Sequence, residues 1–105
     1  MGSVRRSLLL FLALAAFVAP ALVSAQSEVP ACVRVRAEVR WSAGAYNHIV
    51  VVQNTCDEDA RCQVSTDVNP RPTQVDVPAG ETVETMTFMG SPAREFTPRV
   101  RCELR

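Results

Sequence analysis

Four cysteines are the residues of this sequence with the clearest chemistry: Cys32, Cys56, Cys62 and Cys102. Such a set forms two disulfides or ligates one tetrahedral zinc ion. The paired C-x2-C knuckles common in zinc sites are missing, so the spacing favours disulfides. Of the three possible pairings, we expect Cys56–Cys62, which would close a short acidic loop, and Cys32–Cys102, which would join the first and last strands.

The single histidine, His48, is the next candidate for chemistry. A histidine general base needs a nucleophile placed against it, and no serine of this sequence lies in a nucleophile-elbow context. We therefore expect a hydrogen-bonded or edge histidine and no catalytic residue. The alternative is a minimal enzyme in which His48 meets Asp67 or Asp76. A blue-copper site would need two histidines and a free cysteine.

The acidic run Asp57-Glu58-Asp59 is a candidate calcium ligand. Calcium takes six or more oxygen ligands, and three side chains in a tight loop are too few. We expect a solvated loop, no metal and no cofactor. No spaced pair of carboxylates indicates glycosidase chemistry.

Five arginines on the polar faces of the first and last strands form a possible binding face: Arg34, Arg36, Arg40, Arg99 and Arg101. If Cys32 bonds Cys102, these strands approach and their arginines share one surface. Guanidinium forks bind phosphate or carboxylate groups, here of an envelope glycan or a lipid headgroup; a protein is the third candidate partner. The alternative is a solvated face with cross-strand Arg–Glu pairs. No aromatic residues interleave with the arginines, which argues against nucleic acid as a partner.

Two further arginines lie in predicted loops. Arg94 precedes Glu95 between two strands, and Arg71 stands between two prolines. A rigid domain with disulfides can present such a loop to a protease. A secreted protease inhibitor is therefore an alternative function.

Residues 1–25 have the three parts of a secretory signal peptide. Arg5 and Arg6 precede an apolar run over 7–23, and Val23-Ser24-Ala25 supplies the small residues of a cleavage site. The apolar run is too short and wrongly flanked for a membrane-spanning helix. We expect export to the periplasm or outside the cell, where thiols oxidise. All basic residues are arginine, which favours a GC-rich, bacterial source.

The predicted mature chain, residues 26–105, is one small domain with a thin core. Its nine arginines and eleven acidic residues give a net charge of −2. This balance provides no global attraction to nucleic acid or to an anionic membrane.

Alternating and β-branched patterns predict an all-β chain of about six to seven strands. Apolar and polar residues alternate over 33–41, which indicates a half-buried strand. A second strand is expected over 46–54, and the unbroken run Ile49-Val50-Val51-Val52 at its centre is typical of a central strand that is covered on both faces. The remaining strands are expected at 61–68, 74–77, 81–89, with a bulge near Thr85, and 97–104.

This strand pattern resembles the general class of small exported immunoglobulin-like domains, which implies a β-sandwich; a small barrel is the alternative. Trp41, on the apolar face of the first strand, is similar to the core tryptophan of that class. The expected disulfides depart from its usual bridge between sheets. The function we expect is a non-enzymatic structural or binding module of the cell envelope or extracellular space.

Overall fold

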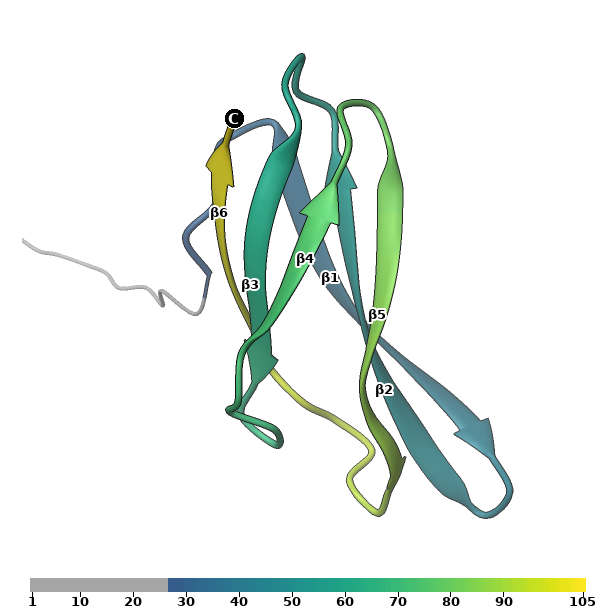
Figure 1. Cartoon of the computed structure of the whole chain (residues 1–105). Helices are drawn as coiled ribbons and strands as arrows, with labels where there is room; N and C mark the ends of the chain where they lie inside the picture. The colour runs from purple at the N-terminus through teal and green to yellow at the C-terminus, as the bar shows by residue number, and fades with distance from the viewer. Residues whose placement is uncertain (1–26) are drawn as a thin grey trace, which may run out of the picture.

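The computed structural model describes residues 27–105, so the predicted signal peptide lies outside the described residues. This part of the chain is all-β, as predicted (Figure 1). The six strands are β1 (Val33–Ser42), β2 (Ala45–Asn54), β3 (Ala60–Thr66), β4 (Thr73–Val77), β5 (Thr82–Ser91) and β6 (Pro98–Leu104). Their positions agree with the predicted ranges to within about two residues.

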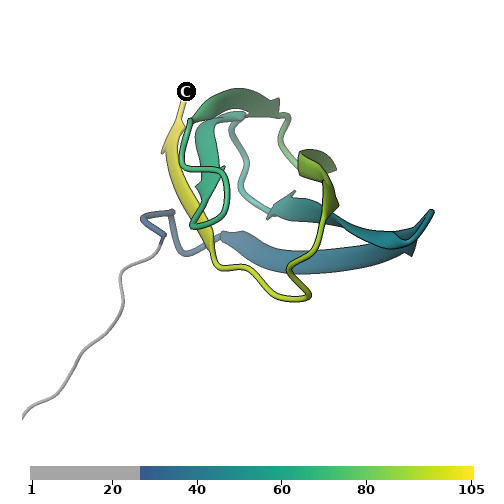
Figure 2. The same ribbon diagram turned by 90° about the horizontal axis from the view of Figure 1, so that it is seen from below.

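The strands form two antiparallel sheets of three strands, in the orders β1-β2-β5 and β4-β3-β6. The buried core contains side chains from both sheets, among them Val50 and Val52 of β2, Val64 of β3 and Val100 of β6. Figure 2 shows the two sheets on different sides of this interior. Each sheet therefore has one face toward the core and one face toward solvent.

Strand β2 is the central strand of its sheet, as its β-branched run predicted. Val50 and Val52 belong to the core between the sheets. Ile49 and Val51 point to the other face, yet each is only 2% exposed. Arg36 lies opposite Val51 and Glu38 lies opposite Ile49 in the register with β1. Long charged side chains on neighbouring strands thus cover this apolar pair from outside.

Trp41 is not a core residue, contrary to the prediction. Its side chain is 62% exposed. The alternation along β1 is real, but the β1–β2 hairpin runs past the end of the second sheet, as both views show (Figures 1 and 2). Beyond that end the inward face of β1 has no opposing sheet to cover it. Tyr46, opposite Trp41 in the hairpin, is its ring partner.

A bulge in β5 separates Met86 from Phe88. Met86 lies opposite Ile49, and Phe88 lies opposite the next residue of β2, His48. Thr87 is therefore the extra residue, two positions after the predicted bulge at Thr85. The insertion turns Phe88 toward His48 while Met86 remains outside, which explains why the alternation of this segment fails in the sequence.

All four cysteines form disulfides, but the predicted pairing is wrong. The bonds are Cys32–Cys56, with Cα atoms 5.2 Å apart, and Cys62–Cys102, with Cα atoms 4.0 Å apart. The prediction assumed that β2 and β3 are neighbours, whereas the chain crosses from one sheet to the other between them. Cys62 instead lies directly opposite Cys102 in the β3–β6 register.

Cys32 lies just before β1, which begins at Val33. The register pair Val33 and Asn54 closes the open end of the β1–β2 hairpin. Cys32 and Cys56 lie just beyond this pair, so their bond joins the two ends of the hairpin. Asn54, fully buried, accepts a hydrogen bond from the Cys56 amide and donates to the carbonyls of Glu58 and Val77.

Peptide mapping under non-reducing conditions will test this pairing directly. Trypsin cleaves after arginine but not before proline, so the four cysteines fall on four different peptides of the denatured chain. We expect the peptide that ends at Arg34 to be linked to peptide 41–61, and peptide 62–94 to be linked to peptide 102–105. A link between 41–61 and 62–94 would contradict the structure.

Candidate functional site

The five predicted binding arginines do not share one surface. Arg34, Arg36 and Arg40 lie on β1, and Arg99 and Arg101 lie on β6, which belongs to the other sheet. The first strand pairs with β2 and the last with β3, so the two strands expected to be neighbours belong to different sheets. The arginines therefore divide into two sets on two separate faces.

The β1 set is part of a network of ion pairs. Glu38 accepts hydrogen bonds from Arg36 at 3.1 Å and from Arg40 at 2.8 Å. Arg40 also donates to Glu84 of β5 at 2.9 Å. The sequence left cross-strand Arg–Glu pairs as the alternative; two of the observed pairs lie within β1, and the Arg40–Glu84 pair joins β1 to β5. Arg34 and Arg36 border a hollow of about 540 Å³ on the same face.

The hydrogen bond from Arg40 is the main cause that lowers the pKa of Glu38 below its ordinary value; Arg36 adds to it, and burial opposes it. Glu38 therefore stabilises the folded state above the ordinary carboxyl range, and this contribution is lost as the pH falls through the lowered pKa. We expect Arg40→Gln to raise the pKa of Glu38 in an NMR titration of its carboxyl carbon. Arg34→Gln, the control, should leave this pKa unchanged.

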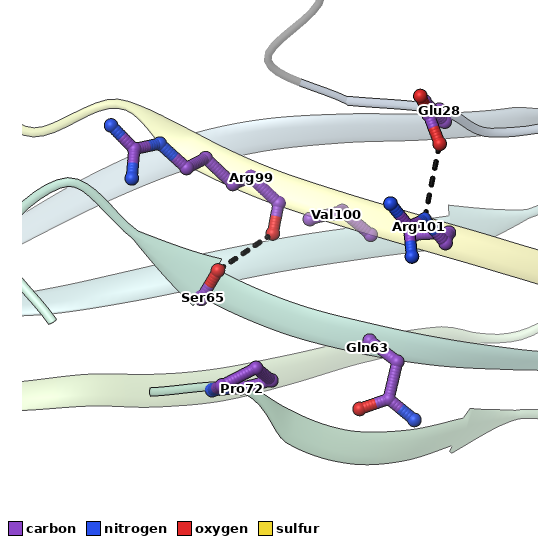
Figure 3. A pocket seen from close by; sticks show the side chains of 7 residues that line it. All are labelled: Glu28, Gln63, Ser65, Pro72, Arg99, Val100 and Arg101. Atoms are coloured by element: carbon purple, nitrogen blue, oxygen red, sulfur yellow. Dashed lines mark hydrogen bonds and ion pairs between the residues drawn. The ribbon is translucent and has the colours of Figure 1, made fainter. Parts of the chain in front are cut away.

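The β6 set lines a hollow of about 470 Å³ on the outer face of the second sheet, which we call the β6 hollow (Figure 3). Its lining comes from the N-terminal segment, β3, the loop before β4, and β6. The residues are Glu28, Gln63, Ser65, Pro72, Arg99, Val100 and Arg101.

Register within the sheet places these side chains together. Gln63 of β3 lies opposite Arg101 of β6, and Ser65 lies opposite Arg99. Opposite residues of antiparallel strands point to the same face. The polar residues of β3 and β6 alternate with buried ones such as Val64 and Val100, so burial of the core side turns them toward solvent.

Glu28 is the one lining residue with a charge opposite to the arginines. Its amide donates to the Val100 carbonyl at 2.7 Å, and its carbonyl accepts from the Cys102 amide at 3.1 Å. These bonds hold the N-terminal segment along the edge of β6, where the Glu28 carboxylate meets Arg101 at 3.0 Å. Sequence reasoning missed Glu28 because the segment before Cys32 has no periodic pattern.

His48 is fully buried and hydrogen-bonded, as expected. Its Nε2 lies 2.8 Å from the Ala93 carbonyl, an acceptor, so Nε2 carries the proton. The ring stacks on Phe96 with centroids 4.4 Å apart. Nδ1 is buried without a hydrogen-bond partner among residues 27–105.

The acids named for an enzyme at His48 are engaged elsewhere. Asp67 accepts from the Thr97 amide at 2.8 Å. Asp76 lies 3.5 Å from Arg61 on the outer face of the second sheet. Neither carboxylate is therefore hydrogen-bonded to the imidazole of His48.

In the acidic run, Asp59 accepts a hydrogen bond from the Ala79 amide. Within the described part of the chain, no group of three or more His, Cys, Asp or Glu side chains is placed to hold a metal ion.

Arg94 lies in an exposed loop that is anchored on both sides. Before it, the Ala93 carbonyl is bound by His48 and the Ala93 amide donates to Ser91. After it, Phe96 is buried against the same imidazole. Arg71, in the loop between β3 and β4, is also exposed. The structure places these two arginines in different loops.

No helix among residues 27–105 is long and apolar enough to cross a membrane. Compared with known proteins, the chain matches no family model, no curated protein and no solved structure.

Proposed function

We propose that this chain is an exported, non-enzymatic binding module of the cell envelope or extracellular space, and that the β6 hollow holds an anionic group of a glycan. The observation that carries the proposal is the cluster of polar groups there: two guanidinium groups, the Gln63 amide and the Ser65 hydroxyl, which donates to the Arg99 carbonyl at 3.4 Å (Figure 3). Two disulfides and the predicted signal peptide support an oxidising compartment.

The proposed architecture is an immunoglobulin-like sandwich. Strands of that class are named by letters in chain order. Strands A, B and E belong to one sheet in the order A-B-E, and strands C, C′ and F belong to the other in the order C′-C-F. The observed orders, β1-β2-β5 and β4-β3-β6, match this arrangement. The Cys62–Cys102 bond departs from it, because it joins two strands of one sheet instead of bridging the two sheets.

The chemistry of the β6 hollow favours a ligand with both acidic and hydroxyl groups. Guanidinium forks bind carboxylate or phosphate oxygens. The Gln63 amide and the Ser65 hydroxyl can exchange hydrogen bonds with sugar hydroxyls. The volume of about 470 Å³ is in the range of small-molecule sites.

Titration with oligogalacturonate, a carboxylated glycan, and with inorganic phosphate will test the site by calorimetry and NMR. We expect binding of the acidic glycan, with amide shifts on β3 and β6, and none of neutral dextran. The double variant Arg99→Gln with Arg101→Gln should weaken binding of the acidic glycan about tenfold or more, because each charge-assisted hydrogen bond contributes about 1.5–3 kcal/mol.

Arg34→Gln with Arg36→Gln is the matched control, since it removes the same charge from the other sheet; affinity should stay unchanged. Glu28→Gln should tighten binding, because it removes the carboxylate that competes for Arg101. The proposal fails if neither probe binds, or if binding survives the loss of Arg99 and Arg101.

The anchored loop supports a second candidate, a secreted protease inhibitor. His48 and Phe96 hold the backbone on both sides of Arg94, and a rigid loop resists cleavage when a protease binds it. Inhibition of trypsin-like proteases at micromolar protein, lost on Arg94→Ala and retained on Arg71→Ala, would support this candidate. Absence of inhibition across a panel of serine and cysteine proteases would exclude it.

A further inference from the structure

The far end of the β1–β2 hairpin is an exposed and uncharged tip. We call residues 41–47 the hairpin tip. A two-residue turn connects its strands, with Ala43 at φ 53° and Gly44 at φ 82°. Positive φ at both positions is typical of the type I′ turn, whose twist matches that of antiparallel strands. The tip is thus a regular hairpin that ends in a defined turn.

Two aromatic side chains stand on this tip. Trp41 and Tyr46 are opposite each other in the register, with ring centroids 4.8 Å apart and an edge-to-face arrangement. The Trp41 side chain remains 62% exposed in this pair. Met89 of β5, which is 74% exposed, follows at the same end, where the Gly90 amide donates to Asn47.

Charged residues are missing from both segments that form this end. The tip reads Trp-Ser-Ala-Gly-Ala-Tyr-Asn, and residues 86–93 of β5 and the following loop also contain no Asp, Glu, Lys or Arg. The nearest charges in sequence are Arg40 and Arg94. Arg40 belongs to the ion-pair network with Glu38 and Glu84, whereas Arg94 lies in an exposed loop. The apolar end itself contains no charged side chain.

The shape of the tip decides what can cover it. Three hollows on residues 27–105, the β6 hollow among them, have neither Trp41 nor Tyr46 in their lining, and the hairpin projects from the body (Figures 1 and 2). A small ligand needs a concave site. A bilayer surface accepts a protruding apolar group without a complementary pocket, and Trp and Tyr are the side chains enriched at that interface.

We propose that the hairpin tip inserts Trp41 into the interfacial layer of a lipid membrane, together with Met89 at the same end of the sheet. The aromatic rings enter the boundary of headgroups and acyl chains, and Arg94 meets the lipid phosphates above it. The domain then sits on the membrane without spanning it. This proposal is independent of the glycan site on β6, which lies on the other sheet.

Trp41 is the only tryptophan of the chain, so its fluorescence reports on the proposed contact directly. We expect its emission to shift to shorter wavelength when vesicles of phosphatidylethanolamine and phosphatidylglycerol are added to the mature protein. Lipids brominated near the headgroup end of the acyl chain should quench this emission more strongly than lipids brominated near its methyl end.

Flotation with the same vesicles measures binding of variants that lack the reporter. Trp41→Ser should reduce vesicle binding about tenfold, since the loss of about 1.4 kcal/mol of apolar burial corresponds to that factor. Leu104→Ser is the control: it removes another exposed apolar side chain, 37% exposed, from the last residue of β6. The end of β6 lies opposite the hairpin tip in the molecule (Figure 1). Circular dichroism checks that each variant is folded.

Unchanged emission with vesicles would overturn the proposal. An emission shift that appears only as protein concentration rises, without lipid, would assign the tip to contact between two copies of the chain and would also overturn it. Equal loss of flotation in Trp41→Ser and Leu104→Ser would show that the tip has no special role.

Discussion

Replacing Cys62 and Cys102 together by alanine is expected to lower the free energy of unfolding by about 4 kcal/mol or more. The bond spans 40 residues of sequence, and the chain-entropy model gives about 3.9 kcal/mol for a loop of that size. Cys62 is fully buried, and Cys102 is nearly so, so the variant also loses core packing. The free energy of unfolding of such domains is about 5 kcal/mol at the low end. We therefore expect the variant to be largely unfolded at 37 °C.

Urea denaturation monitored by circular dichroism will measure this loss. Cys32→Ala with Cys56→Ala is the matched control, because it removes a bond that spans 24 residues at the open end of a hairpin. The same model gives about 3.5 kcal/mol for that loop, with less loss of packing because Cys32 is only half-buried. A larger destabilisation in the control would contradict the position of Cys62–Cys102 in the core.

His48→Ala is expected to cost about 3 kcal/mol of stability and to loosen the Arg94 loop. The fully buried ring is stacked on Phe96 and bound to the Ala93 carbonyl. Truncation of a buried ring leaves a cavity, which costs about 3–5 kcal/mol for larger aromatic residues. His48→Phe preserves the stacking and most of the volume but loses the donor, and should cost about 1–2 kcal/mol.

Denaturation midpoints give the stability of both variants, and limited trypsin digestion reports on the loop. Cleavage after Arg94 should become faster in His48→Ala than in His48→Phe, because only the alanine variant removes both anchors. If His48→Ala is as stable as the natural protein, the ring does not hold the loop. The same result would remove the support that this loop lends to the inhibitor candidate.

The two proposed contact surfaces occupy different parts of the domain. The β6 hollow lies on the outer face of the sheet β4-β3-β6, and the hairpin tip extends from the sheet β1-β2-β5. A glycan on the first surface therefore does not compete with lipid on the second. Variants of Arg101 and Trp41 should act independently, as expected for sites that share no partner.

Local patterns predicted the strands well, because the order of apolar and polar residues within each strand reflects which of its side chains are buried. The alternation over 33–41 and the β-branched run at Ile49–Val52 depend only on which side chains face the interior. Local patterns fixed the end of β3 less well: the strand ends at Thr66 and not at Val68. The Thr66 hydroxyl accepts hydrogen bonds from the amides of Val68 and Asn69, and these bonds turn the chain.

Pairing between distant strands could not be obtained from such patterns. An alternating strand fits against β2 or β6 equally well, so the sequence did not reveal that the chain changes sheets between β2 and β3. The wrong disulfides and the single five-arginine surface both followed from that one error. Trp41 was misplaced for a related reason, since alternation tells which face a residue is on but not whether an opposing sheet reaches it.

The sequence by itself determined that this protein is an all-β chain with its cysteines in disulfides, because strand periodicity and thiol spacing are local properties. Only the tertiary structure decided which cysteines meet, that Glu28 joins Arg99 and Arg101 at one hollow, and that Trp41 stands on a free tip. These features depend on contacts between distant segments: the disulfides span 24 and 40 residues, and Glu28 and Arg101 lie 73 residues apart. Such contacts arise when the two sheets bury their apolar faces together, and the sequence of a single segment does not predict them.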